Sequence, residues 1–404
     1  MLTIFHLSDL HFGEGISRDK EVPRKISKKI KGLEEHDLNI WTDLRNHLTS
    51  TIKQIDNDYR ICVTGDLSRI GSIESYNLAS KFFFDESDSE ISKALGLRLK
   101  RDKFIIAPGN HDSYDESYRK INNLRTFNGV FHSSEEEYPI VKNIEVNNTK
   151  YSFVALDSTY KKNGGNIIKK LGKGNVDKEQ LERVKGHFLD HTKDSAIKVL
   201  LLHHSPIIVD RDRKRSLMLD KSRNVLESIV NSGFNIVLCG HLHDDFYDIL
   251  PLKRLIKFLP KKRGFGRVIK DLFKETQLND YYPIVINGKK ARYFDSIAYH
   301  YIKEHNDVLR VNSRELNSLK KFESYLYNHS KYKEFVDDFY SLTDSETALI
   351  MAGSACKEKE KENSYLELMI EDDLGKMIIK RHKYNKDTRS FVTKTTTKLF
   401  KKSV

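Results

Sequence analysis

The feature that most constrains this chain is a short apolar run that ends in three chemically active side chains. Residues 103–112 read K-F-I-I-A-P-G-N-H-D. The apolar residues predict a short buried β-strand, and the Pro-Gly pair that follows predicts its end. Directly after it come Asn110, His111 and Asp112, which are an amide, an imidazole and a carboxylate. Open α/β sheets bind ligands at the carboxyl ends of their strands, so we expect these side chains to form part of a functional site.

The same arrangement occurs four more times along the chain. The further apolar runs, with the polar side chains that end them, are residues 2–7 (Asp9, His11), 60–64 (Asp66), 197–202 (His203, His204) and 235–239 (His241, His243). One such coincidence carries little weight. Five in one chain predict strands that deliver their end residues to one shared site.

These side chains are suited to metal ions. Carboxylates, imidazoles and amide oxygens are ligands for Mn²⁺, Fe, Zn²⁺ or Mg²⁺, and no thiolate is among them. Two metal ions about 3.5–4 Å apart require a bridging carboxylate. Asp66 stands alone on its strand end, between two richer clusters, and is the natural bridge. The Asp-x-His and His-x-His spacings place both side chains on the same side of an extended strand, which is the geometric reason we infer for them.

The composition is that of a soluble globular protein. The chain of 404 residues has room for one large domain with insertions or for two domains. No apolar run approaches the ~20 residues that span a membrane, and the first residues lead into a strand without a signal-peptide pattern. The three cysteines are widely spaced, which predicts reduced core residues. We therefore expect a cytoplasmic protein without a membrane partner.

A basic segment divides the second half of the chain. The formal net charge is +12, and between Lys253 and Arg292 twelve basic residues face three acidic ones, a local charge of +9. Excess positive charge favours anionic partners such as nucleotides or nucleic acid, although a solvated helical face explains the segment equally well. We expect four parts: residues 1–248 as the core, 249–346 as a basic, mostly helical insertion, 347–385 as closing strands, and 386–404 as a frayed basic tail.

Together the motifs resemble those of a known family. Asp-x-His at Asp9, Gly-Asp at Asp66, Gly-Asn-His-Asp at Asn110, His-x-Pro at His204 and Gly-His-x-His at His241 follow the order found in metallophosphoesterases, the calcineurin-like phosphoesterases. The opening S-D-L-H-F-G is similar to the cyclic-nucleotide phosphodiesterase-like branch. The resemblance covers about residues 1–248. It implies an α/β fold, a four-layer α/β/β/α sandwich with a dinuclear metal centre, in which the basic segment is a largely helical inserted subdomain.

The resemblance also implies a role for each motif residue. By motif match, one metal ion would be held by Asp9, His11, Asp66 and His243, and the other by Asp66, Asn110, His204 and His241. His111 would lie over the phosphate, stabilising charge or protonating the leaving oxygen, with Asp112 orienting it. The implied cofactors are two divalent metal ions. We expect Mn²⁺, with Fe, Zn²⁺ or Mg²⁺ as alternatives, and a bridging hydroxide that attacks phosphorus in line.

Three further polar residues have competing interpretations. His203 adjoins His204, and the His-x-Pro match and strand alternation favour His204 as the ligand. His6 lies inside the first predicted strand and outside every motif, so we expect a core histidine. Asp157 ends another apolar run, where we expect a role in a turn or cap rather than in the site.

Ligand chemistry and resemblance lead to one functional hypothesis. We expect a dinuclear metal-dependent phosphohydrolase, and within that class a phosphodiesterase acting on a nucleotide or nucleic acid, because the basic segment favours such anions. The rival enzyme is a phosphomonoesterase or protein phosphatase. The rival outside enzymes is a binding module in which metal ions brace the fold and the basic segment binds nucleic acid or protein. The physiological substrate and the oligomeric state leave no readable pattern in the sequence.

Overall fold

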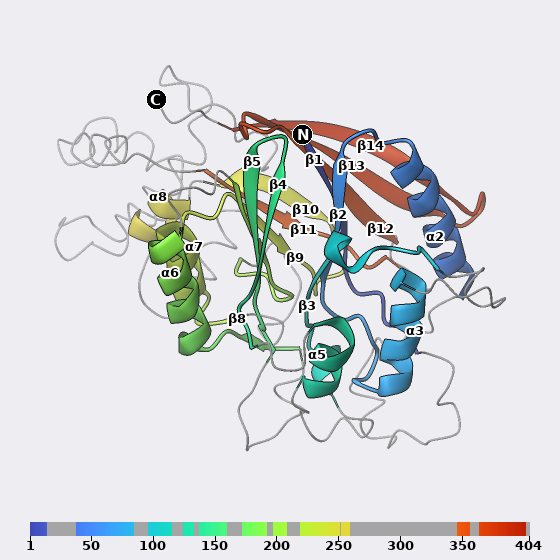
Figure 1. Cartoon of the computed structure of the whole chain (residues 1–404), viewed down its shortest axis with the longest axis horizontal. Helices are drawn as coiled ribbons and strands as arrows, with labels where there is room; N and C mark the ends of the chain where they lie inside the picture. The colour runs from blue at the N-terminus through green and yellow to red at the C-terminus, as the bar shows by residue number, and fades with distance from the viewer. Residues whose placement is uncertain are drawn as a thin grey trace, which may run out of the picture.

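Two β-sheets lie face to face at the centre of the protein, and helices cover both outer faces (Figure 1). This arrangement confirms the expected four-layer α/β/β/α sandwich. The computed structural model describes residues 1–13, 38–84, 96–114, 124–132, 137–159, 172–191, 197–207, 219–250, 252–258, 346–355 and 363–400.

Three parallel strands form one half of the first sheet. Across this sheet the order is β14 (Ser390–Leu399), β13 (Lys376–Asn385), β12 (Ser364–Ile370), β1 (Leu2–Leu7), β2 (Asp58–Thr64) and β3 (Phe104–Ala107). β1, β2 and β3 run parallel, whereas β12, β13 and β14 are antiparallel to their neighbours. Because parallel strands end at the same edge, the polar residues that follow β1, β2 and β3 are brought to one edge of the sheet.

The second sheet has the same parallel centre. Its order is β10 (Phe246–Leu250), β11 (Thr347–Met351), β9 (Ile236–Cys239), β7 (Ile197–Leu201), β5 (Thr149–Ala155) and β4 (Ile140–Val146). β5, β7, β9 and β11 run parallel, and β4 and β10 are antiparallel edge strands. A short pair beside them joins β6 (Gly174–Asn175) to β8 (Leu219–Asp220). The residues after β7 and β9 therefore also share an edge.

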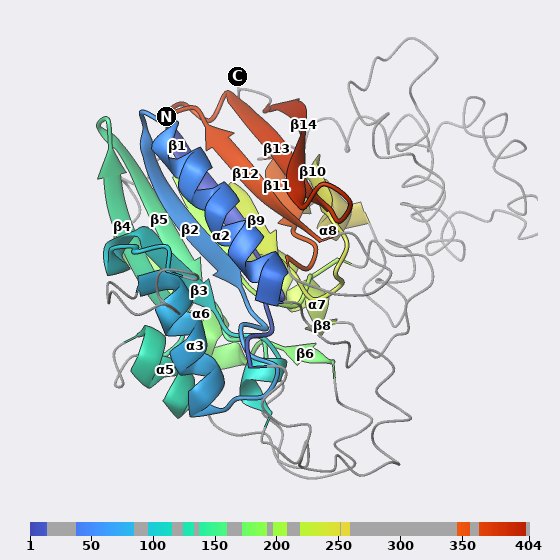
Figure 2. The ribbon, with the colours of Figure 1, turned by 90° about the vertical axis from the view of Figure 1, so that its right-hand side faces the viewer.

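The helices present one apolar face to a sheet. In the first helix, Trp41, Leu44 and Leu48 are buried while Asn46 and Ser50 are exposed, which is the three-to-four-residue period of an amphipathic helix. This helix lies along the outer face of the first sheet (Figure 2). The first-sheet side holds α2 (Leu38–Lys53), α3 (Ile73–Phe84) and α5 (Arg125–Phe131), and the opposite side holds α6 (Lys178–His191), α7 (Ser222–Asn231) and α8 (Leu252–Phe258).

The prediction that residues 386–404 form a frayed tail is wrong for most of this segment. Residues 390–399 form β14, which pairs with β13 along ten residues. Six of its ten residues are threonine, valine or phenylalanine, which favour β-strands, and its two lysines suit an exposed edge strand. The prediction from charge alone overlooked that β propensity.

The expected end of the core at residue 248 falls inside β10, which continues to Leu250 and pairs with β11. Residues 252–258 then form the short helix α8. Residues 259–345, most of the expected insertion, lie outside the described residues, and so does nearly all of the basic segment. Their helical character and their binding role stay predictions.

Two simpler expectations concern cysteines and membranes. Cys62 and Cys239 are buried free thiols, as predicted, and Cys356 lies outside the described residues. Among the described residues, no helix has both the length and the apolarity to cross a membrane.

Candidate metal centre

The loops after β1, β2 and β3 meet the loops after β7 and β9 where the two sheets adjoin. Potential ligand atoms there lie within 4.8 Å of one another in four overlapping groups: Asp9, His11 and His243; His11, Asp66 and His111; Asp9, Asp66 and His203; and His203, His204 and His241. Asn110 joins them through His203, whose Nε2 lies 3.0 Å from Asn110 Oδ1. The structure therefore brings together every expected metal ligand.

Asp9 is fixed so that one carboxylate oxygen faces the histidines. Its Oδ2 accepts hydrogen bonds from Ser8 Oγ (2.5 Å) and from the main-chain N–H of His241 (3.1 Å). Its Oδ1 lies 3.1 Å from His243 Nε2 and 4.0 Å from His11 Nε2. One oxygen thus holds the loops together and the other is presented to the site.

Asp66 lies between the two sets of ligands, as expected of a bridging carboxylate. Its Oδ2 is 3.2 Å from His203 Nε2 on one side and 4.0 Å from His11 Nε2 on the other. Its Oδ1 accepts the main-chain N–H of His111 at 2.8 Å. The side chain is buried, with 1 % of its surface exposed, so these contacts are shielded from water.

His203, and not the expected His204, is the imidazole in contact with Asp66 and Asn110. Its Nδ1 donates a hydrogen bond to the main-chain carbonyl of Thr64 at 2.7 Å, which directs Nε2 at the two side chains. In these contacts His203 takes the place expected of His204. The expectation rested on strand alternation continuing through the motif, but β7 ends at Leu201 and both histidines lie in the loop beyond it.

The expected partnership of His111 and Asp112 is also wrong. His111 Nδ1 donates to the main-chain carbonyl of Arg69 at 2.8 Å, so this carbonyl orients the ring. The carboxylate of Asp112 instead accepts four hydrogen bonds: from Gly109 N, Leu67 N, Ser68 N and Ser68 Oγ, at 2.9, 3.3, 2.9 and 2.9 Å. Asp112 therefore ties the loop after β3 to the loop after β2.

The main chain of the ligand residues is left-handed rather than extended. The φ angles are 54° at Asp9, 47° at His11, 50° at Asp66, 71° at His241 and 55° at His243. A non-glycine residue in this region is uncommon and is held there by its surroundings, often at functional sites. The spacing of Asp-x-His and His-x-His therefore does not reflect an extended strand, as we inferred, but tight turns just beyond β1 and β9.

Two glycines allow these turns to approach closely. A Cβ on Gly109 would lie 2.2 Å from the main-chain nitrogen of Asp66, and a Cβ on Gly65 would lie 2.6 Å from Gly109 Cα. Gly65 also has a φ of 81°. A side chain at either position would force apart the loops that carry Asp66 and Asn110.

The pKa values reflect burial and the mixture of charges. Burial would raise the pKa of Asp66, but nearby His203 and His111 bring it well below its usual range. Burial would lower the pKa of His203, and the contact with Asp66 raises it instead, to about 9. Burial together with His203 lowers the pKa of His241 to about 3. In the metal-free protein the site thus holds an ionised Asp66, a protonated His203 and a neutral His241. The carboxylate and the neutral imidazole can bind a cation, and His203 would release its proton when it binds one.

Buried polar atoms without partners show that the residues fit metal ions. His204 Nε2 and His241 Nε2 are buried and make no hydrogen bond, and buried Asp9 Oδ1 has His243 Nε2 as its neighbour at 3.1 Å. Such atoms are costly unless another group satisfies them, and an ion is one such group. Imidazole nitrogens and carboxylate oxygens are suitable ligands for divalent ions, and Asp66 is shared by two of the groups. The chemistry and placement of these atoms suit two divalent cations.

Several supporting residues were missed by the sequence analysis. Tyr114 Oη accepts hydrogen bonds from Asn110 Nδ2 and from Gly172 N, both at 3.0 Å, which turns Asn110 Oδ1 toward the site. Ser354 Oγ donates to the main-chain carbonyl of Asp9 at 2.9 Å. Tyr114 could have been found next to its motif. Ser354 is 345 positions from Asp9, and no local signal announces that contact.

The expectations for His6 and Asp157 are confirmed. His6 is fully buried in β1, and its Nε2 lies 2.9 Å from Thr64 Oγ1. Asp157 Oδ1 accepts hydrogen bonds from the main-chain nitrogen and the hydroxyl of Thr159, at 2.8 and 2.6 Å. This is an Asx turn beside the site rather than a ligand.

Comparison with solved structures finds matches of low sequence identity and low TM-score. GAP50, the anchor in the inner membrane complex of Plasmodium, is 8% identical over 100% of this chain and 90% of that chain, with a TM-score of 0.41. Vps29 from Entamoeba histolytica complexed with zinc is 9% identical over 98% of each chain, with a TM-score of 0.29. A 5'-nucleotidase precursor from Thermus thermophilus is 12% identical over 99% of this chain and 54% of that chain, with a TM-score of 0.35. A search of curated proteins finds no match.

A family model decides the class of protein. The model of the calcineurin-like phosphoesterases matches residues 2–245, which include every residue of the metal centre. The protein is a metal-dependent phosphoester hydrolase. The chain belongs to the calcineurin-like phosphoesterase family, and the resemblance inferred from the motifs is confirmed.

Proposed function

We propose that this hydrolase is a dinuclear phosphodiesterase that acts on a nucleotide or nucleic-acid phosphodiester. The observation that carries the dinuclear part is the position of Asp66, whose carboxylate lies within reach of ligand groups on both sides. One ion would be held by Asp9, His11, Asp66 and His243, and the other by Asp66, Asn110, His203 and His241. Divalent ions supply an activated water at neutral pH and positive charge for the attacking and leaving oxygens. Mn²⁺ remains the ion we expect.

His111 is suited to donate a proton to the leaving oxygen. Its ring is half-buried and stands edge-on to His11, with the ring centroids 4.7 Å apart. Because Nδ1 is bound to the Arg69 carbonyl, Nε2 is the nitrogen that can exchange a proton with a substrate. Its main-chain N–H is held by Asp66, so the proton donor and the bridging carboxylate are fixed relative to each other.

The choice of a nucleotide or nucleic acid as the substrate rests on charge. The net charge of +12 favours anionic substrates, and the basic segment that begins at Lys253 supplies most of that excess. If the substrate is a polynucleotide whose phosphates are neutralised by several basic residues, its affinity should fall steeply with salt. A flat salt response would exclude a polynucleotide and leave small nucleotides as the substrate.

The experiment is a comparison of two substrates after metal exchange. The full chain is stripped of metal and reloaded with Mn²⁺, and hydrolysis of bis(p-nitrophenyl) phosphate is compared with that of p-nitrophenyl phosphate. The matched control is His132→Gln, because His132 directly follows α5 and belongs to none of the groups of possible metal ligands. Faster cleavage of the diester, lost in Asp66→Asn and kept in His132→Gln, supports the proposal. A preference for the monoester would establish the phosphatase alternative. No turnover of either substrate, with two ions bound, would establish the binding-module alternative.

A further inference from the structure

The last two strands of the first sheet carry basic side chains on one face, close to the metal centre. In the register of β13 and β14, Arg381 lies opposite Lys394, and Lys383 lies two residues further along β13. Residues that are opposite each other on two strands, and residues two positions apart on one strand, share a face of the sheet. Arg381, Lys383 and Lys394 therefore form one surface, which we call the β13–β14 basic patch.

Contacts with the second sheet show which face carries the patch. Thr396 and Lys398 follow Lys394 along β14 at the same two-residue spacing. Thr396 Oγ1 lies 3.4 Å from Tyr247 Oη, and Lys398 Nζ donates to Asp248 Oδ1 at 3.1 Å, and both partners belong to β10. The basic patch therefore lies on the face turned toward the second sheet, opposite to the face that α2 covers.

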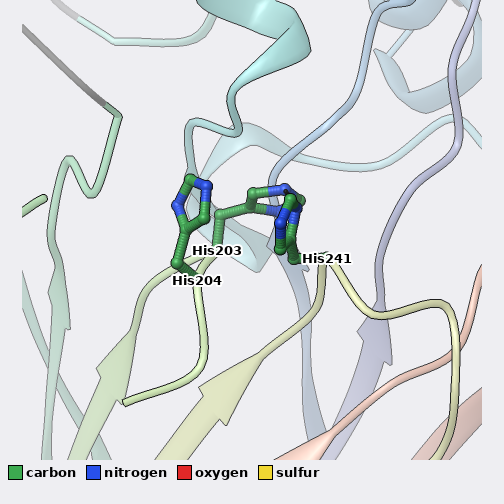
Figure 3. Close-up of side chains that lie close together, drawn as sticks. All are labelled: His203, His204 and His241. Carbon is green, nitrogen blue, oxygen red and sulfur yellow. Dashed lines mark hydrogen bonds between the residues drawn. The ribbon is translucent and has the colours of Figure 1, made fainter. Parts of the chain in front are cut away.

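Asp245 connects the basic patch to the metal centre. Figure 3 shows His241 at the exit of β9, and the same loop continues through the expected ligand His243 to Asp245. Asp245 Oδ2 lies 2.6 Å from Arg381 Nε and accepts a hydrogen bond from Ser364 Oγ at 2.7 Å. The basic patch thus begins directly beside the loop that carries His241 and His243.

The fold leaves part of this positive charge unmatched. Asp245 pairs with Arg381, whereas Lys394 is exposed and makes no ion pair with any residue that the structure describes. Like charges directly opposite each other on two strands are destabilising, yet Lys394 stands opposite Arg381. An anion that lies across this pair would relieve the repulsion, so the patch is suited to an anionic partner.

We propose that the β13–β14 basic patch binds a nucleic-acid strand through its phosphates and thereby presents one phosphodiester of that strand to the metal centre. The patch extends from the centre along two strands. A polymer with an anion at every repeat reaches both the patch and the centre, whereas a small nucleotide occupies only one of them. Contacts to phosphates fix the position of a strand on a protein, which is the role we assign to the patch.

This inference rests on the proposed function, because it names the substrate class of the same site. Membership of the family does not supply the patch. The family model matches residues 2–245, and β13 and β14 lie beyond that range, at residues 376–399. The patch is therefore a property of this chain's own C-terminal strands.

The test measures binding without turnover. The metal-stripped full chain is titrated in a chelator with a labelled single-stranded DNA of about twelve nucleotides, at several salt concentrations. For single strands, log affinity falls with log salt by about 0.7 per phosphate neutralised, so Lys383→Gln/Lys394→Gln should reduce this slope by about 1.4 and lower affinity at low salt by at least about tenfold. The control Lys53→Gln/Lys81→Gln removes the same charge from exposed positions on α2 and α3 and should retain the affinity and slope of the parent protein.

A second variant covers the case in which the double variant does not fold. In Lys394→Glu, the new carboxylate is opposite Arg381 and can pair with it, so the midpoint of urea unfolding should be no lower than in the parent protein. Affinity for the DNA should still fall by about tenfold. A lower midpoint together with weaker binding would assign Lys394 a structural role and overturn the proposal. With Mn²⁺ restored, the ratio of kcat/KM for the oligonucleotide to that for bis(p-nitrophenyl) phosphate should fall by a similar factor.

The proposal is overturned if the patch variant and the control lose affinity equally, because net charge rather than the patch would then bind the DNA. It is also overturned if a dinucleotide binds as tightly as the longer strand. If poly-glutamate displaces the DNA as readily as unlabelled DNA does, the patch takes an acidic protein instead. Binding is measured without metal. Loss of phosphodiesterase activity alone would therefore count against the proposed function, and loss of DNA binding alone would count against the patch.

Discussion

Nε2 of His203 lies 3.2 Å from Oδ2 of Asp66, and this contact joins the two β-sheets, because His203 follows β7 and Asp66 follows β2. The pKa of His203 is raised to about 9 despite burial, and the pKa of Asp66 is lowered, which describes an ion pair in the metal-free protein. The site is therefore held together by its own charges before any ion binds.

Removing one partner of this pair should destabilise the metal-free protein. In His203→Ala, the buried carboxylate of Asp66 loses its closest cation, and breaking a buried pair in this way costs about 3–5 kcal/mol. The double variant His203→Ala/Asp66→Asn should recover part of that loss. The measurement is urea unfolding in a chelator. If the two single effects simply add in the double variant, the pair does not contribute as a unit.

Asp112→Asn should weaken the loops without changing the proton donor. An amide in place of the carboxylate would turn an N–H group toward the donors of Gly109 or Ser68, at a cost of about 1–3 kcal/mol. Turnover should fall by the same factor for every leaving group, because His111 is oriented by the Arg69 carbonyl. Unfolding and turnover are compared with Asp157→Asn, in which Oδ1 can keep both bonds to Thr159. If turnover fell only for substrates with basic leaving groups, Asp112 would orient His111 after all.

The strands and most site residues could be predicted because their signals are local. β1 and β3 match the predicted apolar runs, and each predicted strand exit carries a residue of the site. The choice between His203 and His204 could not be made, because both follow the same apolar run and the orientation of each is set by a distant oxygen. For His203 this is the Thr64 carbonyl, 139 positions away.

The missed strands show the same limit. β10 pairs with β11, whose residues come about a hundred positions later in the chain. The sequence near residue 248 does not indicate this pairing, so the strand was not predicted. The lysines of β14 led to the prediction of an exposed tail in place of a strand. Lys398 pairs with Asp248 at 3.1 Å, so its charge is partly matched inside the fold rather than repelled from it. The charge of a segment predicts that its side chains are exposed. Here the pairing of β14 with β13, and of Lys398 with Asp248, determined the structure of the segment instead.

The buried His6 should make the protein less stable in acid. Burial lowers its pKa from 6.5 to about 3, so between these values the unfolded chain binds more protons than the folded one. Its contribution to stability is intact above pH 6.5 and is lost progressively toward pH 3, by about 1.4 kcal/mol per pH unit at most.

The variant that tests this is His6→Gln, which can still bond to Thr64 Oγ1 but does not titrate. Unfolding free energies are measured in urea at pH 7.5 and 4.5, in a chelator. The loss on acidification should be smaller in the variant by about 2 kcal/mol. Equal losses in both proteins would show that His6 is not the group responsible.

His111→Ala should impair substrates with basic leaving groups most. A nucleoside alkoxide needs a proton as it leaves, whereas p-nitrophenolate does not, and a positioned acid contributes about 10²–10⁴-fold. We expect a loss of that size for a dinucleotide and a much smaller loss for bis(p-nitrophenyl) phosphate. Asp66→Asn, which alters the bridging carboxylate, should lower both rates alike. Equal losses in His111→Ala would assign His111 to charge stabilisation rather than proton donation.

The C-terminal strand should contribute to stability through Phe391. Its ring stacks on His47 of α2, with centroids 5.0 Å apart and planes at 18°, and contacts Tyr365 and Tyr384 at 5.6 and 5.2 Å. Phe391→Ala should cost about 1–3 kcal/mol, less than the ~3–5 of a fully buried phenylalanine, because the ring is only partly covered. The neighbour Val392 is 57% exposed and makes a matched control, since Val392→Ala should change stability by no more than about 0.5 kcal/mol. Urea unfolding measures both. Equal effects of the two substitutions would mean that residues 390–399 behave as the loose tail first expected, and a large effect of Phe391 alone would show that β14 anchors α2 to the first sheet.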